Sequence, residues 1–513
     1  MSASTEKKNR QAAREAGTDK KTLALEKEAQ EQAKKKRRWT IGTVCVALVV
    51  VLVLVLNSGI TNRLTAFTVG DRNFNTSEVS YYYSNEYMNF ANQYGSYASL
   101  IGLDTSNGIR GLEKQECPML ENGGTWKDYF MDAARHDMIQ TTILKKYAAE
   151  NSITLDADEL SQLDASFSGI DEQARSYGYA NGDKMLAANY GSGVDRKLVR
   201  GAYQDALLAS KASEALSDSF TYTDAELEEK YESYEGSHDL FDYAYCYVSA
   251  ERVDSTDADG NTSSAPTEET LAAAQATAEK IMETYKAAKG DSPAVRLNNA
   301  AESEGQSSNN PTRVQGSGVP ASEWMLDKSR QEGDVTVEPD DGGCYVVVFL
   351  SRDDNHYATA NVRHILVKAE ADEEGNYTDE AKAAAKAKAE EILAEYESGD
   401  KTEESFAKLA EEYSEDAGSN TNGGLYENVA KGQMVQEFND FCFGGHKSGD
   451  TGIVYGESGS YAGYHVMYYV GDGMLYSSSI AQSDMRTEAV EEWMTKAEEA
   501  NPTKDGFGMK FVG

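Results

Sequence analysis

Two apolar runs, each carrying a histidine, constrain the fold of the C-terminal half more than any other feature. The first is Val362 to Lys368, with His364 near its start, and the second is Gly463 to Met467, with His465 at its centre. Short runs of Val, Ile and Tyr bounded by glycines or charged loops are typical of β-strands. The sequence therefore predicts two strands, each with its histidine on one face, that pair with each other.

The hundred residues between these strands carry further ordered signals. Helices are predicted from about 378 to 396 and from 402 to 413. Three short segments follow: Tyr413 to Asp416, Asn422 to Leu425, and Lys431 to Phe438. This order, with histidines at both ends, resembles the parvulin family of peptidyl-prolyl isomerases. The resemblance implies an α+β domain at 358–472 with a four-stranded antiparallel sheet.

The resemblance also implies roles for particular side chains. Family members hold two histidines at the centre of the sheet, which implies catalytic roles for His364, His465, Asp416 and Ser414. The apolar groups that hold the substrate proline ring match Leu425, Met434 and Phe438. The chain departs from the family after Leu425, where Tyr426-Glu427-Asn428 stands in place of Gly and an aromatic residue. We therefore expect the loop beside the pocket to be shaped differently.

A repeat precedes this domain. The segment 278–285 mirrors 389–396, a strand precedes each copy, and a strand that begins with a glycine, Gly343 or Gly463, closes each copy. Residues 241–352 are therefore predicted to form a degenerate parvulin-like domain, with Tyr245 and Tyr345 in place of the histidines. If these tyrosines face each other in an antiparallel pair, the residue after Tyr245 is expected to meet the residue before Tyr345, which brings Cys246 and Cys344 together. The sequence leaves open whether they form a disulfide or stay as buried free thiols.

The residues before the repeat are predicted to be helical. Segments 126–148 and 198–216 place apolar residues on one face, and Asp156-x-x-Glu159 and Thr223-x-x-Glu226 are typical helix starts. Residues 62–240 resemble the helical chaperone domain of PrsA/SurA-type foldases. That resemblance implies that the helix 477–500, within the C-terminal segment 473–513, completes the domain. An independent terminal helix is the alternative.

The N-terminus has a different composition from the rest of the chain. Residues 1–38 carry a net charge of +6, within a total of −37, and an uncharged apolar stretch follows. A basic segment before some 17–25 apolar residues is typical of a transmembrane anchor with a cytoplasmic N-terminus. Residues 39–58 are therefore predicted to be a single transmembrane helix, with a cleaved secretory signal as the alternative. The prediction places the protein at the cell membrane of a Gram-positive bacterium, with its C-terminal domains outside.

The composition argues against several other classes of protein. The acidic excess would repel nucleic acid. The six histidines show no His-Glu-x-x-His spacing and the cysteines no Cys-x-x-Cys spacing, so neither a metal nor another cofactor is expected. The sequence thus predicts a membrane-anchored foldase that isomerises X-Pro bonds and binds unfolded, exported polypeptides. A non-catalytic holdase and a scaffold for envelope assembly are the alternatives.

Overall fold

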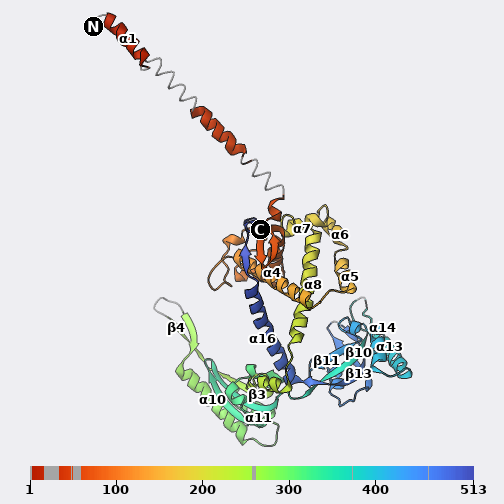
Figure 1. The fold of residues 1–513 in the computed structure, drawn as a ribbon. Coiled ribbons are helices and arrows are strands. Elements are labelled where there is room, and N and C mark those ends of the chain that lie inside the picture. Colours follow the sequence, from red (N-terminus) through yellow and green to blue (C-terminus); the bar gives the residue numbers. More distant parts are fainter. Residues whose placement is uncertain are drawn as a thin grey trace. The chain divides into compact units, whose positions relative to one another are not determined.

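The chain divides into two compact units of mixed helix and antiparallel sheet. The computed structural model describes residues 3–16, 34–47, 49, 59–256, 262–372, 374–459 and 461–512 (Figure 1). One unit combines Met1–Phe220 with Ala489–Gly513, and the other is Thr221–Glu488. The boundary thus falls at residue 220, whereas the helical domain predicted from sequence extends to 240.

The first unit is mostly helical. Its described elements are α1 (Ala3–Glu15), β1 (Thr65–Val69), β2 (Arg72–Asn75), α3 (Thr76–Tyr94), α4 (Trp126–Glu150), α5 (Ala157–Ser166), α6 (Ile170–Ser176), α7 (Gly182–Tyr190), α8 (Arg196–Ser219) and β14 (Thr503–Asp505). Asp156 caps α5 through the reciprocal hydrogen bonds predicted from its spacing to Glu159. Tyr81, Tyr83 and Tyr87 of α3 are buried, so these rings belong to the core and are not available to bind unfolded chains.

The C-terminal segment packs into this unit. Helix α16 (Tyr476–Ala500) places Trp493 against Tyr147 of α4, with ring centroids 5.3 Å apart. Leu144 and Leu216 lie in the same apolar cluster. Strand β14 then pairs with β1, with Phe67 opposite Asp505, to give the order β14-β1-β2. Residues more than 400 positions apart therefore share one sheet.

The second unit begins with α9 (Asp224–Glu232), capped by Thr223 as predicted, and continues with two modules. The first module contains β3 (Leu240–Ser249), β4 (Arg252–Thr256), β5 (Thr262–Pro266), α10 (Glu268–Ala287), α11 (Pro293–Ser303), β6 (Ser308–Asn309), β7 (Val314–Gln315), α12 (Ser322–Met325), β8 (Val335–Asp340) and β9 (Gly343–Asp353). The second module contains β10 (Ala358–Lys368), α13 (Asp379–Ser398), α14 (Glu403–Tyr413), β11 (Leu425–Val429), α15 (Gln436–Cys442), β12 (Thr451–Ser458) and β13 (Tyr461–Leu475).

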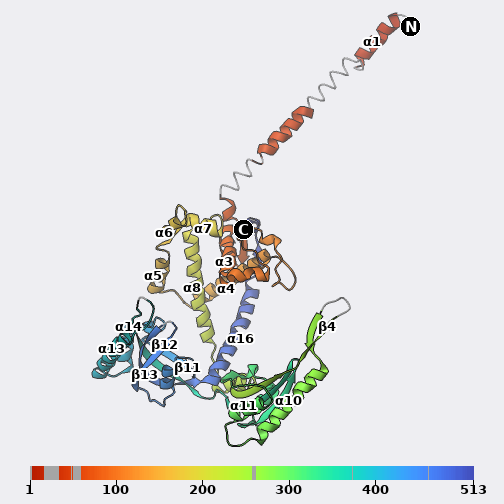
Figure 2. The ribbon, with the colours of Figure 1, turned by 180° about the vertical axis from the view of Figure 1, so that it is seen from behind.

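The two modules share one topology. The second sheet has the order β11-β10-β13-β12, and the first has β6-β3-β9-β8, with β7 also paired to β3. Helices α13 and α14 cover one face of the second sheet, where Phe406 packs on Ile365 and Tyr468 (Figure 2). Helices α10 and α11 cover the same face of the first sheet, with Ile281 and Leu297 fully buried. The opposite face carries a single short helix in each module, α15 in the second and α12 in the first.

Strand register is also shared, and it corrects one prediction. His364 lies opposite Met467, and His465 lies opposite Leu366, so the histidines are two positions out of register and meet on a diagonal. Tyr245 and Tyr345 are displaced in the same way. Each pair still brings its rings together, at centroid distances of 5.2 and 5.8 Å.

This displacement separates the two cysteines of the first module. Cys246 lies opposite Val346, and Cys344 lies opposite Val248, so the expected direct pairing of Cys246 with Cys344 is wrong. Both are free, fully buried thiols in the apolar cluster beneath α10. Burial raises the pKa of each thiol to about 11, which keeps both protonated. The alternative of two small buried hydrophobes is the one the structure supports.

The predicted transmembrane helix is a second correction. Within the described ranges, no helix combines the length and the apolar character needed to cross a membrane. The single N-terminal transmembrane helix of the predicted fold class is therefore wrong on this finding, and the anchor at 39–58 stays a prediction. Residues 48 and 50–58 of the predicted segment lie outside the described residues.

Candidate functional site

The face of the second sheet that packs against α15 carries two buried histidines in contact. His364 on β10 and His465 on β13 approach through their Nδ1 atoms, which are 3.0 Å apart. Phe438 of α15 stands edge-on to both rings, with centroids 5.4 Å from each. Since the two imidazoles are hydrogen-bonded to each other and packed against a phenyl ring, they form a fixed floor for the site.

Asp416 extends this pair on the His364 side. Its Oδ2 atom lies 2.9 Å from Nε2 of His364, and Oγ of Ser419 donates to the same oxygen at 2.5 Å. The hydrogen bond from His364 lowers the pKa of Asp416 well below its ordinary value, against the opposing effect of burial. The carboxylate is therefore ionised, and His364 is the donor in their hydrogen bond.

That donor fixes the direction of the remaining hydrogen bonds. In its neutral form, His364 has no proton on Nδ1, so Nδ1 of His465 must donate to it. Nε2 of His465 is then an acceptor, and the hydroxyl of Tyr461 lies 3.1 Å from it. Burial first, and then the neighbouring His364, lowers the pKa of His465 to about 3, so its ring stays neutral. The chain of hydrogen bonds thus runs from Tyr461 through His465 and His364 to Asp416.

Local sequence places Asp416 beside β10. The Oγ atom of Ser414 accepts the amide hydrogens of Leu366 and Asp416, at 3.1 and 3.3 Å. Gly424 lies against the backbone of His364 in a left-handed conformation, where an added Cβ would stand 2.2 Å from the His364 carbonyl oxygen. Only glycine fits this position, because both the φ angle and the space exclude a side chain. The Asn422-Gly423-Gly424 segment therefore closes the loop that carries Asp416.

An apolar seat adjoins these polar groups. The histidines and Asp416 line a cavity of about 450 Å³, with Met434, Val435 and Phe438 forming its apolar wall. The remaining lining residues are Leu366, Lys368, Tyr426, Gln433, Ser458 and Tyr461. Clefts of this size with an apolar wall and a few fixed polar groups are typical of small ligand sites. A ring the size of proline fits such a seat.

Most predicted site residues meet in this cavity, and two do not. His364, His465, Asp416, Met434 and Phe438 all line it. Ser414 does not, because its buried hydroxyl holds the backbone of the loop. It is a positioning residue.

Leu425 is also absent from the lining, and its neighbour Tyr426 takes the place assigned to it. Successive strand residues face opposite sides, so an error of one position moves a side chain off the site.

Three residues of the site were missed in the sequence. Tyr426, Ser419 and Tyr461 all hydrogen-bond to its polar groups. Tyr461 precedes His465 by four positions in one strand, so the period of two places both on one face and could have found it. Ser419 carried the weaker signal of a serine three residues after an aspartate.

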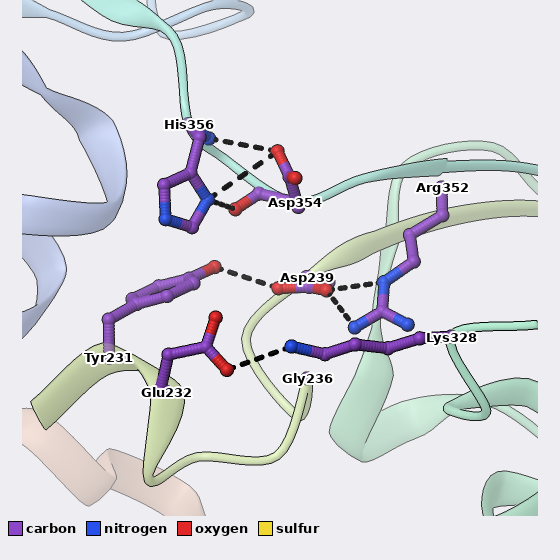
Figure 3. Close-up of a pocket in the computed structure, with 8 residues that line it drawn as sticks. All are labelled: Tyr231, Glu232, Gly236, Asp239, Lys328, Arg352, Asp354 and His356. Carbon is purple, nitrogen blue, oxygen red and sulfur yellow. Dashed lines mark hydrogen bonds and ion pairs between the residues drawn. The ribbon is translucent and has the colours of Figure 1, made fainter. Parts of the chain in front are cut away.

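A separate cavity of about 220 Å³ lies where α9 meets the first module (Figure 3). Its charged groups are matched with one another. Asp239 accepts from Tyr231 at 2.9 Å and pairs with Arg352, and Lys328 pairs with Glu232 at 2.8 Å. None of the predicted site residues lines it. These contacts join α9 to the first module. The candidate functional residues all lie in the second module.

The comparisons with known proteins agree with that location. Residues 347–468 match the family model of the PPIC-type PPIASE domain. The predicted peptidyl-prolyl isomerase domain of parvulin type is therefore confirmed. No curated protein sequence matches the chain.

Solved structures similar to the chain include PrsA proteins and a SurA-like chaperone. Peptidylprolyl isomerase PrsA of Bacillus cereus is 24% identical over 28% of this chain and 49% of its own, with a TM-score of 0.18. Foldase protein PrsA of Streptococcus pneumoniae is 10% identical over 71% and 82%, with a TM-score of 0.20. A SurA-like chaperone of Campylobacter jejuni is 10% identical over 57% and 82%, with a TM-score of 0.18. The chain spans only 49% and 59% of the first two structures it matches.

Proposed function

We propose that the protein is a foldase whose second module isomerises X-Pro bonds in unfolded, exported polypeptides. The observation that carries the proposal is the junction, in one cavity, of an apolar seat with a fixed row of hydrogen-bonded polar groups. In this proposal His364, His465 and Asp416 act on the rotating bond, Ser414 positions them, and Met434 and Phe438 hold the proline ring.

The reaction does not require these residues to make or break a covalent bond. Rotation about the peptide bond meets a barrier of ~18–20 kcal/mol because resonance stiffens the C–N bond. No covalent bond breaks, so catalysis requires only that the twisted state bind more tightly than either planar state. Met434 and Phe438 remove water from the proline ring, and the ionised Asp416 provides a negative charge beside the carbonyl carbon. A fixed, partly dry site favours the less conjugated amide.

The other parts of the chain are proposed to bind the polypeptide before and after isomerisation. These parts are the helical domain 62–240, completed by helix 477–500 within the C-terminal segment 473–513, and the first module at 241–352. The isomerase module itself is 358–472, and no binding role is proposed for the basic segment 1–38. Action outside the cytoplasm is part of the proposal. It is supported by the basic start and following apolar run, which are typical of exported chains.

The test is the cis/trans isomerisation rate of a series of proline tetrapeptides with the full chain. Met434→Ala removes much of the apolar seat and Asp416→Ala removes the charge. Losing the burial of one such side chain costs about 1.5–3 kcal/mol, so we expect kcat/KM to fall roughly tenfold or more for Met434→Ala. Gln436→Ala, an exposed change two residues from Met434, is the matched control and should keep the wild-type rate.

Two outcomes would contradict the proposal. If the folded wild-type chain does not accelerate any peptide, the enzyme is excluded and a holdase that only binds unfolded chains remains. If acceleration occurs but survives both substitutions, the catalytic site lies elsewhere.

A further inference from the structure

Tyr426 occupies a position in the cavity that combines an apolar wall with a hydrogen-bond donor. It lies on the edge strand β11, opposite Val362 of β10. Its ring centroid is 5.2 Å from that of His364, and its hydroxyl donates to Oδ2 of Asp416 at 3.0 Å. Tyr426 therefore touches both the seat for the proline ring and the polar end of the site.

The oxygen that accepts this hydrogen bond is already occupied. Oδ2 of Asp416 also accepts from Ser419 at 2.5 Å and lies 2.9 Å from the donor nitrogen of His364. A carboxylate oxygen offers about two lone-pair directions, so three donors exceed its capacity. Of the three, Tyr426 makes the longest contact and is only half-buried, whereas His364 and Ser419 are 3% and 0% exposed. The hydroxyl of Tyr426 is the donor that this oxygen can most readily release.

The other donors at the floor of the cavity are committed. The hydroxyl of Tyr461 bonds to Nε2 of His465, and the N–H groups of His465 and His364 that join the two rings and Asp416 lie within the row of hydrogen bonds. Burial and the nearby Asp416 raise the pKa of Tyr426, so its hydroxyl keeps its proton. A bound substrate beside Asp416 and His364 therefore meets the hydroxyl of Tyr426 as a transferable donor.

We propose that Tyr426 is a catalytic residue whose hydroxyl leaves Asp416 and donates a hydrogen bond to the prolyl nitrogen while the X-Pro bond is twisted. This inference rests on the proposed isomerase function. In a planar amide the nitrogen lone pair is delocalised into the carbonyl and accepts no hydrogen bond. In the twisted amide the lone pair is localised on nitrogen and becomes an acceptor. The donor therefore stabilises the transition state and not the ground state, which is the condition for a gain in rate.

The test compares Tyr426→Phe with wild type in the full chain. The substitution keeps the ring that walls the seat and removes only the donor. We measure isomerisation of the enzyme-bound peptide by NMR exchange spectroscopy and peptide affinity by chemical-shift titration. A hydrogen bond made only in the twisted state should cost about tenfold in the bound isomerisation rate, with peptide affinity unchanged. Tyr455→Phe, which removes a hydroxyl on β12 that bonds to Glu457 outside the cavity, should keep both values.

A second measurement changes the peptide and compares the same two proteins. A peptide with 4-fluoroproline has a less basic prolyl nitrogen, so the wild-type acceleration over the uncatalysed rate should fall, and Tyr426→Phe should not show this fall. Equal bound rates in wild type and Tyr426→Phe, or equal responses of the two proteins to fluorination, would overturn the role of Tyr426 alone. A wild-type chain without any acceleration would overturn the isomerase function and this inference together.

Discussion

The two modules of the second unit are built on the same frame and differ in what fills its centre. In the second module the diagonal pair is His364 and His465, and Asp416 and Tyr461 continue it as a row of hydrogen bonds. In the first module Tyr245 and Tyr345 occupy the same diagonal and pack with Tyr243 and Tyr247 as aromatic neighbours. The frame places two side chains in contact, and the identity of those side chains decides whether the result is a polar site or an apolar cluster.

The comparison teaches that the supporting loop matters as much as the pair itself. Asp416 reaches His364 because Ser414 and Gly424 hold its loop against β10. The first module has no segment resembling Tyr413 to Asp416 between its helix α11 and strand β6. Restoring histidines at 245 and 345 would therefore provide the imidazoles without their acceptor.

The largest expected effect comes from truncating the aromatic residue of α15. Phe438→Ala removes a buried ring that contacts both histidines, and we expect it to cost about 3–5 kcal/mol of stability in the second module and nearly all isomerase activity. In the first module Trp324 follows Gly318 by the same six positions that separate Phe438 from Gly432, and it packs against the aromatic cluster of that sheet. Trp324→Ala is therefore the counterpart and should leave the isomerisation rate unchanged. Peptide isomerisation and urea unfolding of the full chain measure both. A loss of activity in the Trp324 variant equal to that in the Phe438 variant would break the comparison.

A smaller loss of stability is expected when the carboxylate of Asp416, which accepts the hydrogen bonds of the site, is removed. Asp416→Ala removes the acceptor shared by the N–H of His364 and the O–H of Ser419. Nε2 of His364 still lies 3.2 Å from Oγ of Ser419, so one of the two donors is left buried without a partner, at about 1–3 kcal/mol. We expect faster hydrogen exchange in β10 and β13 and unchanged exchange in β3 and β9, measured by mass spectrometry on the full chain. Asp416→Asn retains an acceptor oxygen and should lose less. Equal changes in both modules would show that the effect is not local to the site.

The smallest expected effect is a difference between the two modules in how their stability changes as the pH falls. Burial lowers the pKa of His465 from 6.5 to about 3, so below pH 6.5 the unfolded chain binds a proton that the folded module does not. Stability contributed by the neutral ring is fully present above pH 6.5 and is lost as the pH falls towards 3. Between pH 6.5 and 5 the loss amounts to roughly 1–2 kcal/mol. Tyrosine hydroxyls take up no proton in this range, so the first module lacks this contribution.

Hydrogen exchange in the two modules between pH 7 and 4.5, corrected for intrinsic rates, measures that difference. His465→Gln cannot titrate and should remove the additional slope of the second module. The same slope in wild type and in this variant would assign the acid response to other groups.

The sequence predicted the positions of the strands and of the site residues better than it predicted strand register and side-chain contacts. Runs of β-branched residues located β10 and β13, and the resemblance to parvulins assigned Met434 and Phe438, which line the cavity. Strand register was not predictable, because composition leaves a pairing offset of two positions undetermined. This is why Cys246 and Cys344 were expected to meet. The same limit explains why Leu425 was predicted to line the cavity where Tyr426 is found, since a strand of five residues does not reveal which face is buried.

The pairing of β14 with β1 has a consequence for the order of folding. The first unit cannot complete its sheet until residues 503–505 have left the ribosome or the export channel, because they supply its edge strand. The second unit, Thr221–Glu488, has all its strands available before that moment. During vectorial synthesis or export the isomerase module is therefore finished first, while the helical unit waits with an unpaired β1. A chain cut short by even a dozen residues would carry a folded isomerase beside an incomplete helical unit.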